Sequence, residues 1–152
     1  MDELNKNISA TEKIEKKMPL YKKILWGVLI LVVIFVIVQF TNASKYKMTV
    51  MVVEGENVLG VNPTTEKLDF GDLSRNNGMI RRINIVNGGS LKTRVIVFKF
   101  GEVSELIKLN KNFFVLNPGD KFELTFDINI PASAEFREYK GNVWIFRLPK
   151  IF

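Results

Sequence analysis

The first candidates for chemistry in this chain are carboxylates, because the sequence contains no histidine and no cysteine. Their absence removes thiolate nucleophiles, imidazole bases and the usual zinc ligands. Two acidic pairs remain as candidates for acid and base catalysis, Glu102 with Glu105 and Glu135 with Glu138. No apolar pocket that would shift a pKa is indicated around either pair. We therefore expect solvated loop charges, no catalytic residues and no enzyme activity.

Asp69 and Asp72 are the acids best placed for a cation site, since they lie beside a predicted turn. Calcium takes about six to eight oxygen ligands, which two acids rarely supply, so we expect no metal site. There is no glycine-rich phosphate loop, and we expect no cofactor and no small-molecule substrate. The formal net charge of +6 comes from basic residues that alternate with acids. This distribution does not predict a nucleic-acid partner.

One apolar run organises the chain, residues 24–40, with no charged side chain between Lys23 and Lys45. Extended back to Leu20, a helix at about 1.5 Å per residue reaches the ~30 Å thickness of the hydrocarbon layer. Lipid offers backbone amides no partners, so the span must be a continuous helix. We predict a transmembrane helix over residues 20–41. Its anchor residues are Trp26, Leu29, Val33, Ile37 and Phe40.

Lysines set the expected orientation of this span. They are frequent from Lys13 to Lys23 and fewer after it, at Lys45 and Lys47. The positive-inside bias then places residues 1–19 in the cytosol as a charged tail and residues 42–152 outside the membrane. We expect a single-pass protein of the cell membrane.

Two other interpretations of the apolar run stay open. Thr41-Asn42-Ala43 is a tolerable cleavage site for a signal peptide, although the preceding polar stretch is long and the apolar run exceeds the usual length. A subunit similar to the type IV pilins would pack the helix into a filament. The chain lacks the Gly-aromatic cleavage site and the acidic residue at the helix start that are typical of that family.

After the span, the hydrophobic period changes to that of strands, and about seven antiparallel strands are expected. They cover residues 47–54, 67–70, 79–87, 91–100, 112–116, 121–130 and 142–148, with a short addition at 58–61. The clearest alternation lies in residues 121–130 and predicts a half-buried strand. Asn87-Gly88-Gly89-Ser90 predicts a hairpin that pairs residues 79–87 with 91–100. Short strands separated by turns indicate a β-sandwich.

From residue 67 to 148 the order of motifs resembles the immunoglobulin-like sandwiches of the ASH and major sperm protein group. The motifs are Leu68-Asp69-Phe70-Gly71, Ile83 to Gly88, Phe113 to Gly119, Leu124 to Pro131 and Tyr139-Lys140-Gly141. The resemblance implies an immunoglobulin-like fold in a binding or spacer module, without catalytic residues to carry over. It also implies that Tyr139 is a corner tyrosine whose hydroxyl ties down a loop.

Trp144 and Phe146 are the candidate partner surface, because the last strand is apolar on both faces. If Val143 and Ile145 face the core, the two aromatic residues point away from it and mark a partner surface or an edge for strand addition. The alternative is that the chain's own N-terminal segment, or residues 151–152, covers them.

Together these features predict a membrane-anchored, non-enzymatic binding or scaffold protein with an immunoglobulin-like domain just outside the membrane. Its partners are the lipid bilayer and a protein of the membrane or envelope, since the short linker holds the domain close to the bilayer. The alternative function is a structural subunit of a larger membrane or cell-surface assembly.

Overall fold

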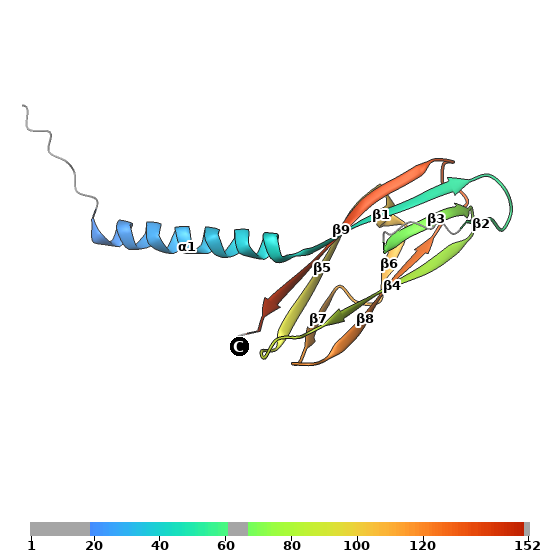
Figure 1. Cartoon of the computed structure of the whole chain (residues 1–152). Coiled ribbons are helices and arrows are strands. Elements are labelled where there is room, and N and C mark those ends of the chain that lie inside the picture. Colours follow the sequence, from blue (N-terminus) through green and yellow to red (C-terminus); the bar gives the residue numbers. More distant parts are fainter. Residues whose placement is uncertain (1–18, 61–66, 151–152) are drawn as a thin grey trace, which may run out of the picture. The chain divides into compact units, whose positions relative to one another are not determined.

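The computed structural model describes residues 19–60 and 67–150. The expected tail before Pro19, and residues 151–152, lie outside the described part. The elements are one α-helix, one short 3-10 helix and nine strands in the described part: α1 (Leu20–Asn42), β1 (Ser44–Val53), β2 (Leu59–Gly60), β3 (Leu68–Ser74), β4 (Gly78–Val86), β5 (Thr93–Gly101), η1 (Glu102–Glu105), β6 (Ile107–Leu109), β7 (Phe113–Leu116), β8 (Lys121–Asn129) and β9 (Glu138–Pro149) (Figure 1).

α1 begins at Leu20, as predicted, and contains 23 residues. Proline cannot donate a backbone hydrogen bond, but the carbonyl oxygen of Pro19 accepts one from the amide of Lys22 at 3.0 Å. The helix is long and apolar enough to cross a membrane. The chain divides into two compact units, Met1–Val36 and Ile37–Phe152, so the last turns of α1 belong to the unit that contains the strands.

The strands form two sheets, as expected for a sandwich. The larger sheet has six strands in the order β2-β3-β1-β9-β5-β7, and the smaller sheet has three in the order β4-β8-β6. Figure 1 shows β9 running beside β1 and β5, with β4 and β8 forming a separate layer. The two central strands of the larger sheet, β1 and β9, pair antiparallel from Ser44 with Ile145 to Met51 with Glu138.

The core lies between the two sheets and is built by alternation along the strands. Because successive side chains of a strand point to opposite faces, every second residue is buried. In β8, Leu124, Phe126 and Ile128 are fully buried, as the sequence predicted. The larger sheet contributes the fully buried side chains Met48, Leu68, Phe70, Val95, Val143 and Ile145. Apolar packing between the sheets therefore holds the domain together without a disulfide.

The predicted hairpin at Asn87-Gly88-Gly89-Ser90 is wrong. β4 pairs with β8 in the smaller sheet, whereas β5 pairs with β7 and β9 in the larger one. A type I′ hairpin needs a positive φ at both central residues. Neither Gly88 nor Gly89 has a φ in that region. The segment instead carries the chain from one sheet to the other.

The side chain of Asn87 fixes this crossover. It is 5% exposed, and its Nδ2 donates to the carbonyl oxygens of Leu91 at 2.9 Å and Leu116 at 3.1 Å. Its Oδ1 accepts from the amide of Gly89 at 3.2 Å and from the hydroxyl of Thr93 at 3.1 Å. The buried amide is thus satisfied by partners from the crossover, β5 and β7, which a two-residue hairpin could not supply.

Three further predictions need correction. β1 and β3 pair in parallel, although all strands were expected to be antiparallel; the long connection through residues 54–67 allows the chain to return in the same direction. β3 continues past Gly71 to Ser74, because Gly71 at φ +67° absorbs a register shift against β1. β6 was not predicted, because its three residues are too short to show alternation.

Replacing a side chain between the sheets tests this core. We expect Phe126→Ala to lower the free energy of unfolding by about 3–5 kcal/mol, since it removes a fully buried ring from the middle strand of the smaller sheet. Ile80→Ala in β4 is the matched control; its side chain is 51% exposed, and the expected change is within about 0.5 kcal/mol. Urea unfolding of the full chain in mild detergent measures both, and equal losses would contradict the assigned core.

Candidate functional site: an aromatic outer face

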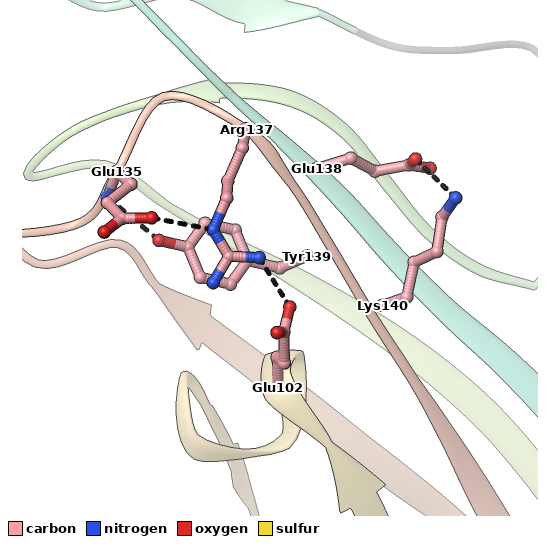
Figure 2. Close-up of polar contacts among 6 residues, drawn as sticks. All are labelled: Glu102, Glu135, Arg137, Glu138, Tyr139 and Lys140. Atoms are coloured by element: carbon pink, nitrogen blue, oxygen red, sulfur yellow. Dashed lines mark hydrogen bonds and ion pairs between the residues drawn. The ribbon is translucent and has the colours of Figure 1, made fainter.

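Three of the four acids in the pairs singled out from the sequence, Glu102, Glu135 and Glu138, form ion pairs with basic neighbours. Figure 2 shows Arg137 between two carboxylates, with Nη1 at 2.6 Å from Oε2 of Glu102 and Nε at 2.9 Å from Oε2 of Glu135. These hydrogen bonds, the one to Glu102 first, raise the pKa of the Arg137 guanidinium above its ordinary value. Glu138 pairs separately with Lys140, at 2.6 Å. All these side chains are solvent-accessible, so these contacts are surface ion pairs.

Arg137 also links this cluster to the buried ring of Tyr139. Its guanidinium carbon lies 4.2 Å from the ring centroid. The Tyr139 hydroxyl accepts a hydrogen bond from the amide of Glu135 at 2.9 Å. The hydroxyl therefore ties down the loop between β8 and β9, as the resemblance implied for Tyr139. The ion pair between Arg137 and Glu102 joins that loop to η1 at the surface (Figure 2).

The acids near Gly71 do not converge. Oδ1 of Asp69 accepts a hydrogen bond from the amide of Gly71 at 2.9 Å, and Asp69 is 8% exposed, whereas Asp72 is exposed. Among the described residues there is no group of three or more His, Cys, Asp or Glu side chains that could hold a metal ion. An open groove of about 720 Å³ runs beside Asp69 and Asp72. Side chains of both charges line it, among them Lys47, Asp72 and Glu138.

The feature that stands apart is an aromatic cluster on the outer face of the larger sheet. In β9, Val143 and Ile145 are fully buried, so Trp144 and Phe146 point away from the core, as predicted. They are half-buried because other rings pack against them. We call this cluster the aromatic face; its members are Phe40, Phe98, Phe100, Trp144 and Phe146.

Edge-to-face contacts connect the whole aromatic face. The ring of Phe40, near the end of α1, lies 5.7 Å from Trp144 and 5.3 Å from Phe146, between centroids. Phe100 lies 5.1 Å from Trp144, and Phe98 lies 5.8 Å from Phe146. Such T-shaped pairs add about 0.5–1.5 kcal/mol each beyond area burial. The chain's own N-terminal segment thus covers part of Trp144 and Phe146, which was the alternative raised from the sequence.

Strand register brings these rings together. Phe98 in β5 lies opposite Trp144 in β9, and Ile96 lies opposite Phe146. Diagonal neighbours across antiparallel strands are within reach of aromatic side chains. The exposed Phe113 of the edge strand β7 lies opposite Ile96 and extends the apolar surface. Phe98 and Phe100 were not predicted here, although the alternation Ile96, Phe98, Phe100 against Val95 and Val97 could have indicated them.

Basic residues border the aromatic face. The Nζ of Lys45 lies 5.2 Å from the ring centroid of Trp144, within the range of a cation–π contact. Lys47, also exposed, lies opposite Asn142, two pairs further along the β1–β9 ladder. Acidic side chains occur on the other half of the same sheet, where Glu138 lies opposite Met51. The outer surface therefore changes from aromatic and basic to mixed charge along the strands.

The rest of the predicted anchor lies in α1, where Trp26, Leu29, Val33 and Ile37 are all exposed. Comparison of the chain with known protein families, curated proteins and solved structures found no match. The resemblance to the ASH and major sperm protein group and the role of Trp144 and Phe146 in binding a protein partner stay predictions.

The contact between Tyr139 and the loop can be tested by removing one oxygen. We expect Tyr139→Phe to lower the free energy of unfolding by about 0.5–1.5 kcal/mol, because it leaves the Glu135 amide without its acceptor while keeping the ring. Tyr139→Leu also removes the ring beneath Arg137 and should cost more. Thermal unfolding of the full chain in mild detergent measures both. An unchanged stability of Tyr139→Phe would show that the hydroxyl does not hold the loop.

Proposed function

We propose that this chain is a single-span membrane protein that presents a non-enzymatic binding or scaffold module just outside the membrane. The observation that carries the proposal is α1. Its 23 residues have no buried member, and its segment between Lys23 and Asn42 has no charged side chain. A single residue, Ala43, separates the helix from β1. Span and module are therefore directly joined.

The length of α1 supports a membrane span. At about 1.5 Å per residue, the helix measures about 35 Å, slightly more than the ~30 Å hydrocarbon thickness. Its side chains, such as Leu29 and Val33, are about half exposed, and lipid would cover them. Lys22 and Lys23 at the start can reach the headgroups. With the positive-inside bias, this arrangement favours a cytosolic N-terminus and an extracytoplasmic C-terminal domain.

The module is, in our proposal, immunoglobulin-like. The two facing sheets support this, as does the hydroxyl of Tyr139 that ties down a loop. The motif resemblance adds Phe70, which is fully buried before Gly71, and Gly119, whose φ of +81° suits the turn after Pro118. The parallel pairing of β1 with β3 departs from the all-antiparallel sandwich that was expected from the sequence.

Binding rather than catalysis is proposed for this module. Of the four carboxylates that could have formed catalytic pairs, Glu102, Glu135 and Glu138 are engaged by Arg137 and Lys140 at the solvent-accessible surface. The short connection at Ala43 keeps the module near the bilayer, so the proposed protein partner belongs to the same membrane or envelope. Sizing of the intact chain in mild detergent separates this role from that of a structural subunit, which would elute as a large complex.

Single-cysteine labelling tests the orientation, because the natural chain has no cysteine and gives no background. In intact cells, a membrane-impermeant maleimide should label Ser90→Cys, whose position is exposed in the module. It should not label Ser9→Cys, in the expected cytosolic tail, until the cells are lysed. Labelling of Ser9→Cys alone in intact cells would reverse the orientation, and labelling of neither would contradict an outer module.

A charge placed in α1 tests the span itself. Val33→Arg should raise the free energy of membrane insertion by about 2.5–3.5 kcal/mol, because position 33 lies near the middle of the helix. We expect a larger share of this variant in the alkaline carbonate extract, whereas wild type and the control Val33→Leu stay in the membrane pellet. Release of the wild type, with a mass that lacks the residues before the module, would instead identify α1 as a cleaved signal peptide.

A further inference from the structure

We propose that the aromatic face lies in the interfacial layer of the bilayer and holds the β domain against the membrane surface. The occupant of this face is the lipid headgroup and glycerol layer, with a preference for anionic lipids. The inference rests on the proposed function, because it requires α1 to span the membrane. It goes further by giving the domain a second, peripheral contact with the same bilayer.

Phe40 determines how deep the aromatic face lies in the bilayer. This residue lies two positions before the end of α1 at Asn42, which is about 3 Å along a helix axis. In a spanning helix, Phe40 therefore sits at the outer interface. Its ring centroid lies 5.7 Å from that of Trp144 and 5.3 Å from that of Phe146. The depths of Trp144 and Phe146 in the membrane therefore differ from that of Phe40 by no more than these centroid distances.

The chemistry of the face fits this depth. Tryptophan is enriched where membrane and water meet, because its apolar ring carries a polar N–H group, and the phenylalanine rings beside Trp144 add apolar area that can enter the boundary between headgroups and acyl chains. Lys45 lies 5.2 Å from the Trp144 ring, and Lys47 follows two residues later in β1. Both are exposed and can reach lipid phosphates. On this half of the sheet, Phe98 and Phe100 provide the remaining rings.

Exposure of the aromatic face to water alone would be unfavourable, because its rings are apolar. Phe98 is 54% exposed, Phe100 41% and Phe40 44%, and they are contiguous rather than scattered. Contiguous apolar patches of this kind are rare on free surfaces. A second copy is the less favoured cover, because it would add a second set of exposed lysines, Lys45 and Lys47, to a face that is already basic at its border. Lipid phosphates complement those charges.

The experiment uses Trp144 as its reporter. The chain has two tryptophans, so Trp26→Phe leaves Trp144 alone. The full-length variant is reconstituted in vesicles of phosphatidylcholine and phosphatidylglycerol that contain lipids brominated at shallow or deep acyl positions. We expect Trp144 emission to be quenched most by the shallow bromines and to be protected from iodide in the water. Quenching by iodide but not by bromolipids would overturn the proposal, and so would protection from both, which indicates a protein cover.

The converse variant separates this proposal from the one on which it rests. Trp144→Phe leaves Trp26, which reports on α1 alone. If bromolipids quench Trp26 but not Trp144, the span stands and the docked face is rejected. If they quench neither, the span itself is rejected.

A charge on the face provides a second readout in the Trp26→Phe background. Phe98→Glu should reduce bromolipid quenching of Trp144 by about twofold or more, because a carboxylate is expelled from the interface and repelled by anionic lipid. Ile80→Glu is the matched control, since Ile80 is 51% exposed, close to the 54% of Phe98, but lies in the smaller sheet. Equal quenching in both variants would overturn the proposal.

Discussion

Burial between two apolar sheet faces is the interaction on which the rest of this structure depends. The chain has no cysteine, so no covalent link supports the domain. Strand geometry then imposes a second condition, since burying one set of alternate residues turns the other set outward. In β9, fixing Val143 and Ile145 in the core forces Trp144 and Phe146 onto the outer face. The aromatic face is therefore a direct consequence of the packing that stabilises the domain.

Local periodicity was enough to predict much of the fold. The helix from Leu20 and the alternating strand β8 were both found from the sequence, because each has a long, regular apolar pattern. The hairpin at Asn87 to Ser90 was wrong because a turn signal gives no information on which sheet the next strand joins. That choice depends on Asn87, whose buried amide binds Leu116, 29 residues further along the chain. Strand β6 was missed because it is only three residues long.

The candidate site was predicted only in part, for a similar reason. The outward direction of Trp144 and Phe146 follows from alternation within one strand, and the sequence contains that alternation. Their contacts with Phe40 and Phe98 depend on how separate segments are placed side by side. No local pattern reports this pairing register. The two acidic pairs were correctly judged as surface charges, but Arg137, which organises both Glu102 and Glu135, was not anticipated.

The position of β1 has a mechanical consequence. It follows α1 after one residue and lies inside the larger sheet, with β3 on one side and β9 on the other. A pull through the helix that is opposed at the far end of the domain would load the hydrogen bonds of both ladders in shear, many at once, instead of peeling an edge strand one bond at a time. Attachment through an interior strand thus resists unfolding under such a load better than attachment through an edge strand would.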